Sequence, residues 1–187
     1  MTGVLVAVVG ASGVGKDAVI GVARQRLGER HDIMFVRRTI SRPADAGGED
    51  HRPVSEAEFG ALERAGAFCA SWRAHGLGYG LPRAALDHVE AGGIAVANGS
   101  RRALPAIRSR FVTVRVVEIT AAPEVIADRL AARGRETADQ IAARLARRVE
   151  AHLAVPGLIA IDNSGPLERA GEALAKLIAE LASPAVS

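Results

Sequence analysis

The segment GASGVGKDAV (residues 10–19) combines glycines, one lysine and one carboxylate at the spacing of a phosphate-binding loop. Gly10, Gly15 and Lys16 occupy the fixed positions of the pattern G-x-x-x-x-G-K. Glycines allow successive backbone N–H groups to turn inward, and a helix that begins after them adds the positive end of its dipole. Lys16 adds a charge that suits the β- and γ-phosphates of a nucleotide. We expect ATP to bind at Gly10, Ala11, Ser12, Gly13, Val14, Gly15, Lys16 and Asp17.

Asp17 stands where such a loop usually carries a serine or threonine, whose hydroxyl coordinates Mg²⁺. A carboxylate is also a hard oxygen ligand, and negative charge is favoured in the first turn of a helix. A second carboxylate normally ends a neighbouring strand, but the apolar run at residues 94–97 is followed by Asn98. We therefore expect Asp17 to bind Mg²⁺. Glu118, at the end of the next apolar run, is the alternative ligand, and a third interpretation is that Asp17 only caps its helix or forms an ion pair.

The elements around this loop follow from the periodicity of apolar residues. A continuous apolar run at residues 4–9 is typical of a buried parallel strand, and the helix after the loop is expected to end near Gly28. Further strands are expected at residues 34–40, 68–74, 94–97, 112–119 and 158–161. Ser55 and Glu58 form a capping box that begins another helix, and residues 76–82 are expected to form a turn. Strands that alternate with helices predict an α/β fold in which helices cover both faces of a parallel sheet.

The length of 187 residues predicts one domain, residues 1–187. The stretch between the second and third strands of the sheet, residues 42–92, is too long for a simple crossover. We expect it to be an insertion into a core made of residues 1–41 and 93–187.

The composition indicates phosphate-binding capacity without choosing a partner. All but two of the 24 basic residues are arginines, the exceptions being Lys16 and Lys176, and a planar guanidinium suits phosphate groups. A net charge of +3 fits nucleic acid and small phosphorylated ligands equally well. Cys69 is the only cysteine, which excludes an intrachain disulfide and fits a reducing cytosol. The apolar run at residues 4–9 is too short for a signal peptide or a membrane span, so we expect a cytoplasmic protein with no membrane partner.

The segment at residues 37–80, the phosphate loop and the later RLAARGRETADQIAARLARR together resemble the guanylate kinase family. The family patterns in the first of these segments are T-T-R-x-P-R, F-x-E-W and Y-Y-G. The resemblance covers most of the chain and implies a P-loop kinase fold. It also implies an acceptor-binding insertion at residues 42–92 and an arginine-rich lid at about residues 133–144. The catalytic residues that it implies are Lys16, Arg133 and Arg144.

The departures from the family pattern concern the base of the acceptor more than its phosphate. Arg42 matches the first acceptor-phosphate arginine, and Tyr79 keeps one aromatic residue of Y-Y-G. Ser71 stands where the family has the glutamate that reads guanine. The region 98–100 stands where the family has the aspartate that also reads the base, and it contains no carboxylate. His51 stands where the family has a phosphate-binding tyrosine. Each unpaired donor of a buried guanine would cost about 1–3 kcal/mol, so we expect a site that does not select guanine.

The segments GASGVGKD, WRAHGLGYG and VANGSR resemble the ribose 1,5-bisphosphate phosphokinases of phosphonate degradation. This resemblance implies phosphoryl transfer from ATP, with Mg²⁺, to a small phosphorylated sugar, ribose 1,5-bisphosphate. The products are 5-phospho-α-D-ribose 1-diphosphate (PRPP) and ADP. The expected substrate-binding residues are Arg38, Arg42, His51, Ser71, Tyr79, Asn98 and Ser100.

Three alternative functions stay open at this point. They are a guanylate kinase that acts on GMP, a non-catalytic guanylate-kinase-like binding module and a nucleic-acid-binding protein. We expect no nucleic-acid partner, because the chain has few aromatic residues on which bases can stack. A homodimer is left open.

Overall fold

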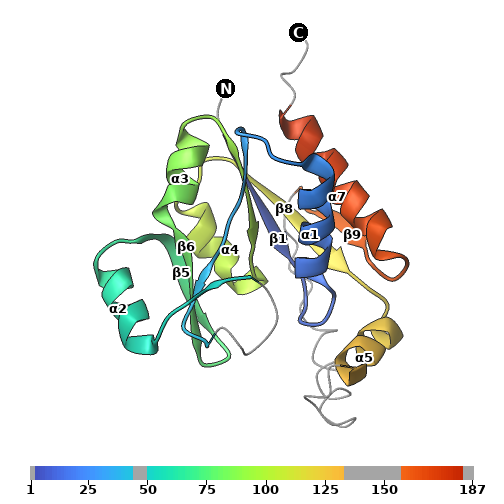
Figure 1. Ribbon diagram of the computed structural model, residues 1–187, viewed down its shortest axis with the longest axis horizontal. Helices are drawn as coiled ribbons and strands as arrows, with labels where there is room; N and C mark the ends of the chain where they lie inside the picture. The colour runs from blue at the N-terminus through green and yellow to red at the C-terminus, as the bar shows by residue number, and fades with distance from the viewer. Residues whose placement is uncertain (1–2, 44–49, 133–156, 183–187) are drawn as a thin grey trace.

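The computed structural model describes residues 3–43, 50–132 and 157–182, and its centre is a parallel sheet (Figure 1). Strand β1 (Val4–Val9) is the middle strand of this sheet, whose order is β2-β7-β1-β8-β9. The other strands are β2 (Ile33–Phe35), β7 (Ile94–Asn98), β8 (Val114–Thr120) and β9 (Ile159–Asp162). Each neighbouring pair is parallel, so the carboxyl ends of the strands meet at one edge.

Helices cover both faces of the parallel sheet (Figure 1), which confirms the predicted α/β fold. They are α1 (Lys16–Leu27), α3 (Arg83–Glu90), α4 (Leu104–Arg108) and α7 (Leu167–Ala182), with the short helix η2 (Arg101–Ala103) before α4. Helix α5 (Pro123–Ala132) lies beyond the ends of the strands (Figure 1), where its Ile126 and Leu130 lie next to Gly13. Strand β1 is buried from both sides: Val6 and Val8 pack with residues of α1 and α7, and Leu5 packs with residues of α3 and α4. None of the helices in the described ranges is both long and apolar enough to cross a membrane.

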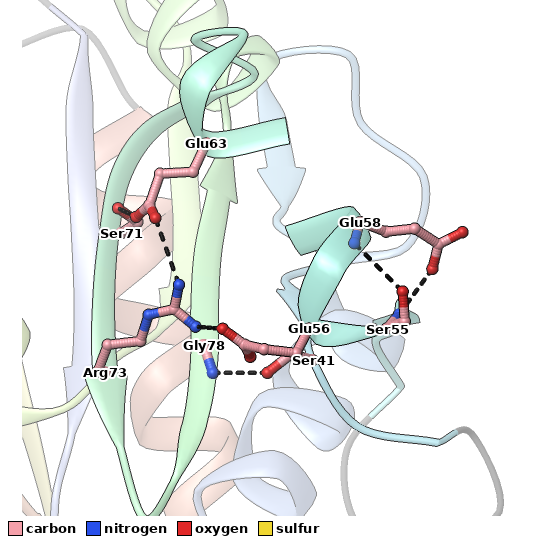
Figure 2. Close-up of polar contacts among 8 residues, drawn as sticks. All are labelled: Ser41, Ser55, Glu56, Glu58, Glu63, Ser71, Arg73 and Gly78. Carbon is pink, nitrogen blue, oxygen red and sulfur yellow. Dashed lines mark hydrogen bonds and ion pairs between the residues drawn. The ribbon is translucent and has the colours of Figure 1, made fainter. Parts of the chain in front are cut away.

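A second, smaller sheet of order β4-β3-β6-β5 lies beside the parallel sheet. Its strands are β3 (Thr39–Ile40), β4 (Arg52–Pro53), β5 (Phe68–Ala74) and β6 (Leu77–Pro82). Helix α2 (Glu56–Arg64) packs on it and begins with the predicted capping box (Figure 2). The Ser55 hydroxyl accepts from the Glu58 backbone N–H at 3.2 Å, and the Glu58 carboxylate accepts from the Ser55 backbone N–H at 2.7 Å.

The predicted single strand at residues 34–40 is wrong, because this segment contributes to both sheets. Strand β2 ends at Phe35, and β3 begins at Thr39. The Val36 N–H still donates to a carbonyl of β7 at 2.9 Å, whereas the Arg38 carbonyl already accepts from the residue that begins β4, at 2.8 Å. The chain therefore crosses between the sheets at Arg37, and strand-favouring residues lie on both sides of the crossing.

The predicted turn at residues 76–82 is also wrong, because Leu77–Pro82 forms β6, which pairs antiparallel with β5. The turn itself lies one step earlier, at His75 and Gly76, whose φ angles are 52° and 73°. Gly80 of β6 serves packing instead: a Cβ there would lie 2.6 Å from the ring of Phe68. Gly78 and Gly80 thus make room for the rings of Phe59 and Phe68, whereas Gly76 belongs to the turn itself.

We predict that Gly80→Ala lowers the free energy of unfolding by about 1–3 kcal/mol, because the added methyl group collides with the Phe68 ring. Urea denaturation measures this change. Gly21→Ala in α1 is the control, since nothing lies within 4 Å of a Cβ added there. It should raise the free energy of unfolding by about 0.5–1 kcal/mol, because glycine is a poor helix former. Equal effects of the two substitutions would contradict this account of β6.

Candidate active site

The phosphate loop joins the end of β1 to the start of α1, at the carboxyl edge of the parallel sheet. Gly10, Gly13 and Gly15 have φ angles of 145°, 91° and 88°. Residues other than glycine rarely adopt φ angles in this range. A Cβ at Gly10 would also lie 2.4 Å from a carbonyl oxygen of β8. The Lys16 ammonium donates to the carbonyl oxygens of Gly10 and Ala11, at 3.1 and 3.2 Å. The glycines therefore permit the loop's shape, and the lysine lies folded against it.

A pocket of about 320 Å³ extends from this loop to the small sheet. Of the predicted ATP-binding residues, it is lined by Gly10, Ser12, Gly13, Gly15, Lys16 and Asp17. Of the predicted substrate-binding residues, it is lined by Arg38, Arg42, Tyr79, Asn98 and Ser100. The lining residues that the sequence did not single out are Ile40, Trp72, Ala74, His75 and Gly99. Ile40, Trp72 and Gly99 lie within two residues of a predicted site residue, so adjacency was their only signal, whereas Ala74 and His75 gave none. The pocket thus combines both predicted binding regions.

Some predicted residues do not line the pocket, namely Ala11, Val14, His51 and Ser71. The side chains of Ala11 and Val14 pack in the core, so these two residues offer only their backbone to a ligand. The predicted lid at residues 133–144, with Arg133 and Arg144, lies outside the described residues.

Strand β5 directs alternate side chains to opposite faces, which decides the place of Ser71 (Figure 2). Trp72 lines the pocket, whereas its neighbours Ser71 and Arg73 face α2. The Ser71 hydroxyl donates to the Glu63 carboxylate at 2.5 Å. Arg73 forms ion pairs with Glu56 and, at 3.4 Å, with Glu63. The side chain at position 71 therefore points away from the pocket.

Arg73 is held on the α2 side by a set of polar contacts (Figure 2). Hydrogen bonding from Ser41, and then from Arg73, holds the pKa of the Glu56 carboxyl below its ordinary value. The Ser41 hydroxyl in turn accepts from the Gly78 backbone N–H at 2.7 Å. Glu56 therefore stays ionised and keeps Arg73 as its partner.

Arg38 lies on an aromatic floor at the small-sheet end of the pocket. Arg38 is only 7% exposed. Its Cζ is 5.6 Å from the ring centroid of Trp72 and 5.1 Å from that of Tyr79. The two rings stack with centroids 5.6 Å apart and planes 6° apart, because β5 and β6 pair these residues directly. Cation–π attraction therefore fixes a guanidinium at the pocket wall.

Arg42 is supported from behind by the buried His51. His51 Nε2 lies 3.3 Å from the Arg42 carbonyl oxygen and donates to it, which leaves Nδ1 as the acceptor for Arg42 Nη2 at 3.5 Å. Within the described ranges, the buried Nε of Arg42 has no hydrogen-bond partner. A buried donor of this kind costs about 1–3 kcal/mol when unpaired, so the site suits an anionic ligand that accepts from it.

The two candidate metal ligands differ in their surroundings. Asp17 lines the pocket and accepts a hydrogen bond from the Asn98 amide, whereas the buried Glu118 forms an ion pair with Arg101 and does not line the pocket. In the part of the chain that the structure describes, Asp17 is the one carboxylate on the pocket wall, and no three metal-ligating side chains gather. Mg²⁺ commonly takes one or two carboxylates together with substrate phosphates and water, so Asp17 fits that ion.

Comparisons with known proteins give close relatives in sequence. No family model matches the chain. It is 50% identical to the ribose 1,5-bisphosphate phosphokinase PhnN of Chelativorans sp. (strain BNC1), over 91% of this chain and 82% of the relative. It is 46% identical to the protein of the same name from Agrobacterium fabrum, over 95% of this chain and 97% of the relative.

Two solved structures that resemble this one are kinases. A guanylate kinase from Anaplasma phagocytophilum superposes with a TM-score of 0.65 at 18% identity, covering 97% of this chain and 88% of the other. A sugar kinase from Janibacter sp. HTCC2649 superposes with a TM-score of 0.53 at 19% identity, covering 96% of this chain and 98% of the other. At these identities the likeness concerns the fold, which is a P-loop kinase fold as predicted.

We predict that Glu118→Gln lowers the free energy of unfolding by about 2 kcal/mol, because it removes the charge that attracts Arg101. The two side chains are only 21% and 6% exposed, so water screens this ion pair little. Urea denaturation measures this loss. The exposed Glu180 of α7 supplies the control, since Glu180→Gln should change stability by less than about 0.5 kcal/mol. A Glu118→Gln protein as stable as the control would show that the ion pair contributes nothing.

Proposed function

Since the chain belongs to the ribose 1,5-bisphosphate phosphokinase family, we propose that its pocket transfers the γ-phosphoryl group of ATP to ribose 1,5-bisphosphate. The products are ADP and 5-phospho-α-D-ribose 1-diphosphate, a step of phosphonate catabolism. The observation that carries the proposal is the composition of the pocket: Arg38 and Arg42 lie opposite the phosphate loop, and the described wall holds no carboxylate besides Asp17.

The donor nucleotide binds at the loop end of the pocket. Backbone N–H groups of residues 10–15 and the start of α1 receive its phosphates, and Lys16 moves from its carbonyl contacts to the β- and γ-phosphates. Asp17, oriented by Asn98, would be the residue that holds Mg²⁺. The ion supplies neutralisation of the charge on the phosphates.

The acceptor binds at the small-sheet end, where recognition requires phosphate groups and a compact body. Arg38 and Arg42 each offer a planar fork that can hold a phosphate through two hydrogen bonds. Trp72 and Tyr79 give this end an apolar floor. A guanine base would need acidic partners for its donors, and position 71, which reads guanine in guanylate kinases, faces α2 here. A guanylate kinase activity on GMP is therefore the less favoured alternative.

The transfer needs no general base, because an ionised phosphate oxygen is itself the nucleophile. An oxygen of the acceptor's 1-phosphate forms a bond to the γ-phosphorus of ATP. The bond from that phosphorus to the β–γ bridging oxygen breaks, and its electron pair leaves with ADP. Positioning and charge neutralisation lower the barrier. We assign the neutralising charges to Lys16 and to Arg133 and Arg144, the two arginines of the predicted lid.

The test is ADP release from Mg-ATP, measured in a coupled assay with ribose 1,5-bisphosphate and, in parallel, with GMP. We predict turnover with the bisphosphate and none above the ATP-only background with GMP, because the pocket binds phosphates and lacks partners for guanine. Turnover with GMP would contradict the argument from the missing carboxylates. Binding of ATP without turnover of either acceptor would assign the site to another phosphorylated compound.

We predict that Asp17→Asn removes most of the effect of Mg²⁺ on ATP binding. In the parent protein, Mg²⁺ should strengthen ATP binding, and the substitution should reduce this gain by about tenfold, because an amide is a weaker ligand than a carboxylate. Calorimetric titration of ATP with and without Mg²⁺ measures it. Asp128→Asn, at an exposed position of α5, removes the same charge away from the pocket and should leave the gain unchanged. An unchanged gain in Asp17→Asn would mean that Asp17 only pairs with Asn98.

A further inference from the structure

The loop that follows β9 contacts the phosphate loop from the side away from the pocket. Asn163 in this loop is only 1% exposed, and its amide Nδ2 donates to the carbonyl oxygen of Val14 at 2.8 Å. The two residues are 149 positions apart in the chain. The backbone N–H of Asn163 donates to the carbonyl of Thr120 at 2.8 Å, which fixes the residue at the end of β8. Asn163 therefore connects the far end of the sheet to the phosphate loop.

Arg129 of α5 reinforces the same contact. One guanidinium nitrogen donates to the Val14 carbonyl at 3.3 Å, and another donates to the Asn163 carbonyl at 2.9 Å. The Val14 carbonyl thus accepts from two side chains that come from different elements. Gly15 packs directly against them, since a Cβ there would lie 2.7 Å from the amide nitrogen of Asn163.

These contacts determine the direction of an N–H group in the phosphate loop. The carbonyl of Val14 and the N–H of Gly15 belong to one planar trans peptide, so they point in opposite directions. Two donors hold the carbonyl toward Asn163 and Arg129, and Gly15 lines the pocket on its other side. The Gly15 N–H is therefore directed toward the pocket. Hydrogen bonds to a carbonyl also polarise its peptide, which strengthens the N–H as a donor.

We propose that Asn163 and Arg129 are positioning residues for the phosphates of the nucleotide. They act through the Val14–Gly15 peptide, whose rotation they block, and they touch neither the base nor the acceptor in this role. The inference rests on the proposed function, since it assumes that the loop binds ATP. It adds two residues that no motif of the phosphate loop contains.

The experiment measures binding of the triphosphate part and of the nucleoside part of ATP with separate ligands. Affinities for ATP, inorganic tripolyphosphate and adenosine, each with Mg²⁺, are measured by calorimetry or NMR titration for Asn163→Asp, Asn163→Ala and Arg129→Gln. Asn163→Asp places a carboxylate oxygen against the Val14 carbonyl. It should reduce the affinities for tripolyphosphate and ATP by about tenfold and leave the affinity for adenosine unchanged. Asn163→Ala and Arg129→Gln each remove one of the two side chains that donate to the Val14 carbonyl. Each should cause a smaller loss of tripolyphosphate and ATP affinity.

The matched control is Ser164→Ala in the same loop. The Ser164 hydroxyl accepts from the Ala122 N–H at 2.8 Å and donates to Asp162 at 2.6 Å, so its loss perturbs the loop without a direct effect on Val14. In Ser164→Ala, the affinities for ATP, tripolyphosphate and adenosine should stay within about twofold of those of the parent protein. Loss of adenosine affinity in Asn163→Asp with tripolyphosphate unchanged would overturn the proposal, because Asn163 would then serve the base. Unchanged affinities in all three variants would overturn it too. A parent protein that binds neither ATP nor tripolyphosphate would instead contradict the proposed function itself.

Discussion

Backbone N–H groups bind a phosphate chain only when several of them converge on one point, and residues 10–15 must meet this requirement at the carboxyl edge of the sheet. The central position of β1 delivers the loop there, and α1 begins directly after it. Glycines at positive φ allow the turn, and the neighbouring strand β7 ends in Asn98, whose amide reaches Asp17. The arrangement of the parallel sheet thus serves the geometry of one loop.

The small sheet completes the pocket by placing charge opposite this loop. Pairing of β5 with β6 sets Trp72 beside Tyr79, and Arg38 lies over both rings. The same pairing turns Ser71 and Arg73 toward α2, where two glutamates hold them. The phosphate-binding character of the acceptor end therefore results from the strand register as much as from the number of arginines. A pocket with cationic walls and an aromatic floor is suited to a phosphorylated sugar.

Local features of the sequence predicted much of this structure. The strand, loop and helix at residues 4–27 are consecutive, and the capping box at Ser55 involves residues three apart, so both are visible in short segments. The division of residues 34–40 between two sheets was not predictable, because both halves favour strands. The glycines of β6 looked like turn residues, since the rings that need their space lie elsewhere in the chain. The contact of Asn163 with Val14 was not predictable either, because the two residues lie 149 positions apart and only the fold brings them together.

The proposed transfer requires that this pocket place the 1-phosphate of the sugar in line with the γ-phosphoryl group of ATP. The most direct test is the ³¹P NMR spectrum of a reaction of Mg-ATP with ribose 1,5-bisphosphate. We expect two coupled resonances from a diphosphate on C1 of the ribose, in amounts equal to the ADP formed, with the 5-phosphate still a monoester. Release of ATP phosphorus only as inorganic phosphate, with both sugar phosphates unchanged, would contradict it.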